Sequence, residues 1–157
     1  MKIADFISKK AVTVLLKSKD KKGVIVELTD LIIKSGAVKP KDKKELIEIL
    51  TDRESLGSTG IGLGIAIPHG KSPKITNLIG AVGISKGGVN FDSLDGEPVY
   101  IFFMLLASQE SAGPHLKALA HISRLLKDKY FRDLLKNAES DKELFDIISK
   151  EDQKRVE

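Results

Sequence analysis

The sequence has no cysteine and no tryptophan, and only two tyrosines and six phenylalanines among its 157 residues. Without cysteine, disulfides, thiolate zinc sites and thiol nucleophiles are excluded. The scarcity of aromatic side chains argues against a platform on which nucleic-acid bases could stack. We therefore expect no nucleic-acid partner, although the formal net charge is +4 and residues 1–50 hold 12 lysines against 7 acidic residues.

Long apolar segments are missing as well. The longest apolar run, Val99–Ala107, has nine residues, whereas a membrane-spanning helix needs about 20. Residues 1–10 also lack the apolar region of a secretory signal. These features favour a cytoplasmic protein with one domain over residues 1–150. We expect residues 151–157 to form a polar C-terminal tail that frays.

The pattern of apolar residues predicts strands interspersed with helices. Alternating or continuous apolar runs indicate strands at 11–16, 65–67, 78–85 and 99–106. Apolar residues at helical spacing, with capping residues before them, indicate helices at about 20–34, 40–54, 114–127, 130–137 and 141–150. The fold class predicted is a single α/β domain, a mixed β-sheet flanked by helices on both sides.

The segment 57–70, GSTGIGLGIAIPHG, holds five of the 13 glycines. It matches neither the dinucleotide fingerprint, because Ile65 or Ile67 falls where the third glycine is required, nor the P-loop, because Leu63 and Gly64 replace its lysine and hydroxyl residue. NAD and ATP are therefore poor candidates, and no cofactor is expected. A glycine turn can bind an anion through backbone N–H groups, or it can simply be a hairpin that needs positive φ angles.

His69 lies at the end of this segment, after a predicted strand end at Pro68 and before Gly70. Imidazole offers a neutral, nucleophilic nitrogen near pH 7. A histidine held between proline and glycine beside an anion-binding turn is therefore a candidate nucleophile. Taken by itself, it is more readily explained as a loop histidine without chemistry.

The other two histidines share one predicted helix, six residues apart, so they lie about 240° from each other around its axis. His115 falls in the first turn near the centre of the buried stripe, where we expect it at the sheet edge. His121 falls on the polar face, where we expect it to be solvated. A three-histidine zinc site is therefore not expected, and no metal site is predicted.

Arg53 follows Leu46 by seven residues and so continues an apolar helical stripe. Such an arginine should lay its stem along the core and place its guanidinium at the helix end, beside the glycine turn. A guanidinium there can bind phosphate, although a helix C-terminus also favours arginine through the helix dipole.

Taken together, these residues resemble the fructose, mannitol and nitrogen-regulatory class of enzyme IIA domains of the bacterial phosphotransferase system (PTS EIIA type-2). The resemblance covers about residues 5–150 and is carried by DRESLGSTGIGLGIAIPHG at 52–70, FDSLDGEPVYIFFMLLAS at 91–108 and HLKALAHISRLL at 115–126. It implies a mixed sheet flanked by helices. It also implies that His69 is the phosphoryl acceptor, through Nε2, with His115 and Arg53 completing the catalytic set.

The resemblance further implies that the donor is the histidine-containing phosphocarrier protein and that the acceptor is a cysteine of enzyme IIB. Since 157 residues leave no room for attached enzyme IIB or IIC regions, we expect these to be separate proteins. The amides of 57–64 are candidates for charge stabilisation, and Ile61, Leu63 and Ile65 for a partner surface.

Three uses of the site stay open. The amino-acid sequences of the motifs are closer to those of fructose-type domains, which favours a phosphocarrier in sugar uptake. The alternative is a nitrogen-type regulator whose phosphorylation state controls binding to regulatory proteins. A third possibility is an anion-binding or nucleic-acid-binding protein that is not phosphorylated. The sequence does not specify the sugar, the cognate enzyme IIB, the oligomeric state or the strand order.

Overall fold

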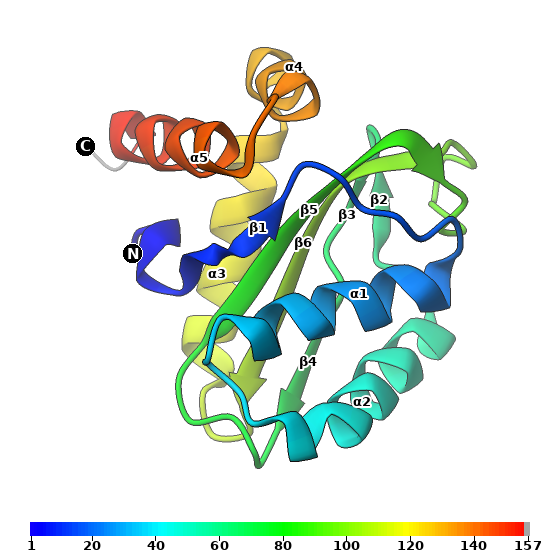
Figure 1. Ribbon diagram of the computed structural model, residues 1–157, viewed down its shortest axis with the longest axis vertical. Coiled ribbons are helices and arrows are strands. Elements are labelled where there is room, and N and C mark those ends of the chain that lie inside the picture. The colour runs from blue at the N-terminus through cyan, green and yellow to red at the C-terminus, as the bar shows by residue number, and fades with distance from the viewer. Residues whose placement is uncertain (156–157) are drawn as a thin grey trace.

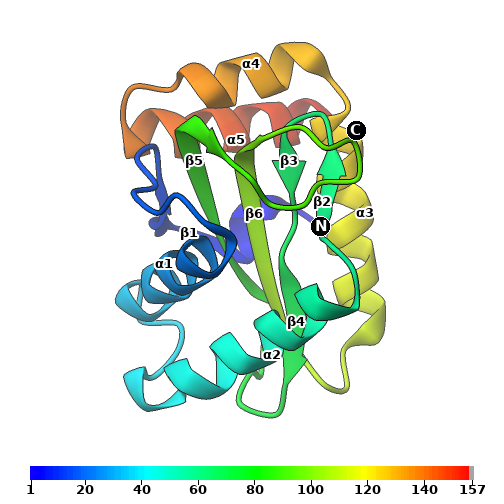
Figure 2. The same ribbon diagram turned by 90° about the vertical axis from the view of Figure 1, so that its right-hand side faces the viewer.

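The computed structural model of the protein describes residues 1–155, which form a six-stranded mixed sheet between two helical layers. Figure 1 and Figure 2 show α1 and α2 on one face and α3, α4 and α5 on the other. The predicted fold class is confirmed. The strands are β1 Ile7–Thr13, β2 Gly60–Gly62, β3 Ile65–Ala66, β4 His69–Ser72, β5 Ile79–Val89 and β6 Val99–Ser108. The helices are α1 Lys21–Lys34, α2 Lys43–Leu56, α3 Ala112–Leu126, α4 Lys129–Asn137 and α5 Asp141–Arg155, with 3₁₀ turns η1 Ile3–Asp5 and η2 Pro40–Asp42.

The strand order is β1-β5-β6-β3-β2, and β4 also pairs with β6. β6 is antiparallel to β5 and parallel to both β3 and β4. Its ten residues are almost all buried because helices cover both faces, as the continuous apolar run predicts.

β3 and β4 lie one after the other along the same edge of β6. Ile65 pairs with Ile101, and His69 pairs with Leu105, so the register is the same on both sides of Pro68. Proline has no N–H to donate, but its carbonyl accepts a hydrogen bond of 2.9 Å from the Leu105 N–H. The prediction that a brief strand is ended by Pro68 is confirmed, because β3 stops at Ala66. The pairing with β6 then resumes at His69, where no strand was predicted.

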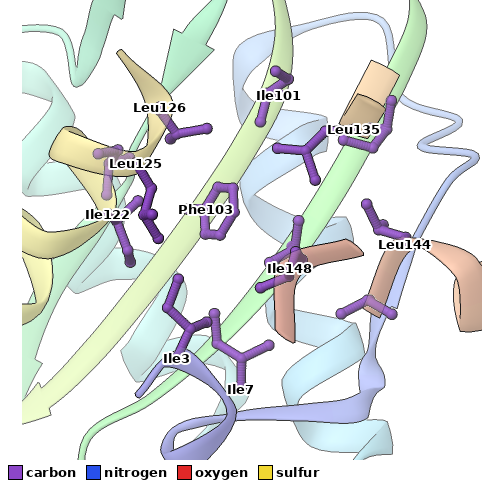
Figure 3. Close-up of a cluster of buried hydrophobic side chains, with 14 of the residues drawn as sticks. Ile3, Ile7, Ile101, Phe103, Ile122, Leu125, Leu126, Leu135, Leu144 and Ile148 are labelled. Carbon is purple, nitrogen blue, oxygen red and sulfur yellow. The ribbon is translucent and has the colours of Figure 1, made fainter. Parts of the chain in front are cut away.

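Two apolar cores fill the spaces on the two sides of the sheet. The core shown in Figure 3 lies between the sheet and α3, α4 and α5, with the fully buried Phe103 of β6 among side chains from both termini of the chain. Burying a side chain of this kind contributes about 1.5–3 kcal/mol. The second core lies against α1 and α2 and contains Phe102 and Met104, the residues that alternate with Phe103 on β6.

Two expectations about the ends of the chain are wrong. β1 begins at Ile7 rather than at residue 11, because a register shift between Ile7 and Val12 places polar residues inside the strand. At the other end, α5 continues to Arg155, so residues 151–155 do not fray, and Glu151 and Asp152 are buried. The last two residues of the predicted tail, 156 and 157, lie outside the described residues.

The prediction that His121 is solvated is wrong. Its Nε2 lies 2.5 Å from Oδ1 of Asp152, and its side chain is only 11% exposed. The other carboxylate oxygen of Asp152 accepts the Ile3 N–H at 2.5 Å. His121, on the polar face of α3, thus contacts the last turns of α5, which helical periodicity within α3 alone does not reveal.

Candidate functional site

His69 opens β4 and is held by the residues just before it. Its Nδ1 lies 2.8 Å from the carbonyl oxygen of Ile67. Because a carbonyl oxygen only accepts hydrogen bonds, Nδ1 carries the proton in this contact and Nε2 keeps its lone pair. Pairing of His69 with Leu105 fixes the backbone at the same point. The ring is therefore oriented as a nucleophile through Nε2.

The surroundings of His69 also favour its neutral form. Burial is the main cause that lowers the pKa of its imidazole below the ordinary value of 6.5. The hydrogen bond to Ile67 raises the pKa, the nearby Arg53 guanidinium lowers it and the Glu54 carboxylate raises it, with a net lowering. The unprotonated Nε2 is thus the prevalent form at neutral pH.

His115 lies beside His69, as predicted, in the first turns of α3. The two ring centroids are 5.3 Å apart and the rings meet edge to face at 76°. His115 is 3% exposed, and its Nε2 has no hydrogen-bond partner among the described residues. Burial, the His69 ring and Lys71 together lower the pKa of His115 to about 4. His115 is therefore a neutral ring with an unused polar atom near the nucleophile.

Arg53 approaches from the last turn of α2. Its Nη1 donates a hydrogen bond of 2.8 Å to the carbonyl oxygen of Gly57, which caps the helix. Ile49, one helical turn earlier, faces the same way and contacts the site at Gly70, where an added Cβ would lie 2.8 Å from its Cγ2. The predicted position of Arg53, at the helix end beside the glycine turn, is confirmed.

These side chains surround one pocket of about 400 Å³ at the free edge of β4. In Figure 2, β4 lies between α2, which crosses in front of it, and α3. Helices from opposite faces of the sheet therefore both contribute residues to one pocket beside β4. The residues that line the pocket are basic, imidazole-bearing or apolar, and none is acidic: Ile49, Arg53, His69, Gly70, Lys71, His115, Leu116 and Leu119. Such a lining suits a small anion next to Nε2.

The family that this architecture indicates is also found by sequence. The family described as "Phosphoenolpyruvate-dependent sugar phosphotransferase system, EIIA 2" matches residues 5–151. The chain belongs to this EIIA family. It is therefore a phosphocarrier, a phosphotransfer component of the PTS, as the motifs around His69 predict.

Relatives of this EIIA chain fall into two groups. The fructose-specific EIIABC component of Bacillus subtilis is 40% identical over 152 residues, which are 97% of this chain but only 24% of that protein. A nitrogen regulatory protein of Bradyrhizobium diazoefficiens is 34% identical over 149 residues, 95% of each chain. The crystal structure of the nitrogen regulatory protein IIA-Ntr from Neisseria meningitidis superimposes with a TM-score of 0.84 at 29% identity, covering 93% of this chain and 98% of that one.

The glycine turn of this EIIA chain is not part of the pocket, contrary to the expectation that its amides stabilise the anion. β2 and β3 pair near the start of β6, whereas His69 pairs near its end. The N–H of Leu63, at the turn, is bonded to the carboxylate of Asp95. Of the three apolar residues considered for a partner surface, Ile65 is core, whereas Ile61 and Leu63 are 45% and 59% exposed.

Lys71 is the site residue that the sequence patterns missed. It lies two residues after His69 on β4, so both side chains point to the same side of the strand. The signal was the spacing His-x-Lys, which is informative only once residues 69–72 are known to be a strand. Lys71 adds a second cation to the pocket.

Within residues 1–155, no group of three or more histidine, cysteine, aspartate or glutamate side chains is placed to hold a metal ion. In the same part of the chain, no helix is both long and apolar enough to cross a bilayer.

Proposed function

We propose that His69 accepts a phosphoryl group on Nε2 from the phosphohistidine of the histidine-containing phosphocarrier protein. The observation that carries this proposal is the contact of His69 Nδ1 with the Ile67 carbonyl, which leaves Nε2 unprotonated in a pocket without acidic side chains. A cysteine of enzyme IIB then receives the group in the cytoplasm, and an enzyme IIC connects the relay to the membrane.

Each of the two transfers forms one bond to phosphorus and breaks another, and neither step needs a metal or a cofactor. In the first, the Nε2 lone pair forms a bond to phosphorus while the phosphorus–nitrogen bond of the donor breaks, and its electron pair stays on the donor imidazole. In the second, the enzyme IIB thiolate forms a bond to phosphorus and the pair returns to Nε2. Such transfers depend on in-line positioning and on stabilising the charge of the equatorial oxygens.

Three side chains of the pocket supply that stabilisation. The ring of His115 is neutral, and its unpartnered Nε2, when it carries the proton, donates a hydrogen bond to a phosphoryl oxygen. Arg53 and Lys71 bring two positive charges from neighbouring elements. All three are held by regular secondary structure, so they are in place before the phosphoryl group arrives.

For the use of this phosphate, we favour fructose-type sugar uptake. The supporting observation is the 40% identity to the fructose-specific component of Bacillus subtilis over 97% of this chain. A nitrogen-type regulator is the second candidate, because the Bradyrhizobium nitrogen regulatory protein matches over 95% of its own length. In that case phosphorylation of His69 would control binding to regulatory partners.

The acceptor assignment is tested with the purified protein and the phosphorylated carrier. The expected product is one acid-labile, base-stable phosphate that is lost in His69→Ala and retained in His121→Gln, a control that changes a histidine outside the pocket. Phosphorylation of a folded His69→Ala variant would refute the assignment. Rapid loss of the phosphate to an enzyme IIB cysteine supports sugar transport, whereas a stable phosphoprotein supports regulation.

A further inference from the structure

Glu54 is a buried carboxylate next to Arg53 that the transfer chemistry does not use. It lies in the last turn of α2 and is 7% exposed. A buried charge is tolerated only when it is paired and hydrogen-bonded. Glu54 meets both conditions: Lys21 Nζ lies 2.9 Å from its Oε2, and Thr59 donates both its N–H and its hydroxyl to the carboxylate.

A continuous series of hydrogen bonds leads from this carboxylate to the His69 ring. Thr59, held by Glu54, accepts the Ile67 N–H on its carbonyl oxygen at 3.0 Å. Ile67 in turn accepts the Nδ1–H of His69 on its own carbonyl oxygen at 2.8 Å. Thr59 and Ile67 flank the pairing of Gly60 in β2 with Ala66 in β3, so both residues lie where this pairing restricts the backbone. A shift of Thr59 is therefore transmitted to the backbone of Ile67 and to the carbonyl that faces His69.

We propose that Glu54 is a positioning residue for His69, acting through Thr59 and Ile67 to fix the carbonyl that selects the Nδ1–H tautomer. This inference rests on the proposed role of His69 as phosphoryl acceptor. It differs from the contributions of Arg53 and His115 because Glu54 touches neither the pocket nor the phosphoryl group.

The negative charge of Glu54 has a second effect at the ring. It raises the pKa of His69 and so opposes the effect of Arg53, its neighbour in sequence. Lys21, the partner of Glu54, is held in place by the buried Phe91, whose ring centroid is 5.0 Å from Nζ. The carboxylate is thus anchored to α1 as well as to the segment that leads to His69.

The substitution Glu54→Gln tests the proposal, because it keeps the size of the side chain and removes the charge. In nitrogen-resolved NMR titrations we expect a lower pKa for His69 and a smaller fraction of the Nδ1–H tautomer. At saturating phosphorylated carrier, we expect the single-turnover rate to fall roughly tenfold or more, as for other small misplacements of a reacting group. The carrier concentration at half-maximal rate should not change.

Asp30→Asn is the matched control. Asp30 and Lys43 form an ion pair of 2.8 Å that also joins α1 to α2, but both side chains are at least 42% exposed. This variant should keep the His69 tautomer, pKa and transfer rate of the unmodified protein. If folded Glu54→Gln matches Asp30→Asn in all three, the proposal is refuted.

If Glu54→Gln does not fold, Thr59→Val replaces it. This variant keeps the Lys21 pair and removes only the hydroxyl that donates to Glu54, and an unchanged His69 tautomer in it would equally refute the proposal. The NMR readouts need no phosphoryl transfer. A failure of His69 to accept phosphate would therefore contradict the proposed function without deciding the role of Glu54.

Discussion

His115 should make the protein sensitive to acid. In the folded state its pKa is about 4, compared with 6.5 for imidazole in water. At a pH between these two pKa values, His115 binds a proton in the unfolded chain but not in the folded chain, so protonation favours unfolding. Stability from this group is therefore complete above pH 6.5 and is lost as the pH falls toward 4.

The size of the effect follows from the two pKa values. Each unit of difference corresponds to 1.36 kcal/mol, so at pH 4.5 the unfavourable contribution of His115 amounts to about 2.5 kcal/mol relative to pH 7. The same effect at His69 adds to it in the same direction, because its pKa is also lowered. A loss of this size is a large part of the 5–15 kcal/mol typical of a domain.

Urea unfolding followed by circular dichroism measures this, in the unmodified protein and in His115→Gln, at several pH values from 7 to 4.5. The substitution removes the titrating ring, whereas His69 titrates in both proteins. We expect the unfolding free energy of the unmodified protein to fall by about 2.5 kcal/mol more than that of the variant. Two curves that run parallel across this range would refute the reasoning, whatever their offset at pH 7.

Four further substitutions, one of them a control, test the packing and the pocket rim. Gly80→Ala would place a Cβ 2.5 Å from the Met104 carbonyl oxygen, so we expect the free energy of unfolding, measured with heat or urea, to fall by at least about 2 kcal/mol. Gly113→Ala is the control: it has open space around it and should be neutral or slightly stabilising. Asp152→Ala removes the hydrogen-bond partner of the Ile3 N–H and of the His121 ring. Calorimetry should therefore show that the free energy of unfolding falls by about 2–4 kcal/mol. Leu116→Gln, at a rim residue that is 66% exposed, should leave the melting temperature unchanged and raise severalfold the carrier concentration needed for half-maximal phosphorylation.

Local patterns in the sequence determine much of the fold. Asp20 caps the predicted helix at 20–34 through a 2.7 Å hydrogen bond from the Gly23 N–H, and the predicted strand at 99–106 lies within β6, at the centre of the sheet. What the patterns missed depends on contacts between distant residues. Asp152 is hydrogen-bonded to Ile3, which is 149 positions away in the sequence, and to His121, which is 31 positions away. Nothing in the sequence around Asp152 marks it as buried.

The candidate site shows the same division. Periodicity placed Arg53 on its helical stripe and His115 in a first turn, but the stripes do not reveal that residues of α2 and α3 converge on one pocket beside β4. That convergence was expected only from the family resemblance. Lys71 stayed hidden because Pro68 was interpreted as the end of a strand, whereas the register on β6 continues through it.

Because β3 and β4 pair with β6 in the same register, the position of His69 has a consequence for the rate of turnover. The backbone on both sides of His69 is tied to the most buried strand of the sheet, so the nucleophile has no hinge through which to swing from a donor toward an acceptor. Turnover should then be governed by how quickly one partner leaves and the next arrives. Backbone amide exchange at 70–72 and 105–108 should accordingly be as slow in the phosphorylated protein as in the free one.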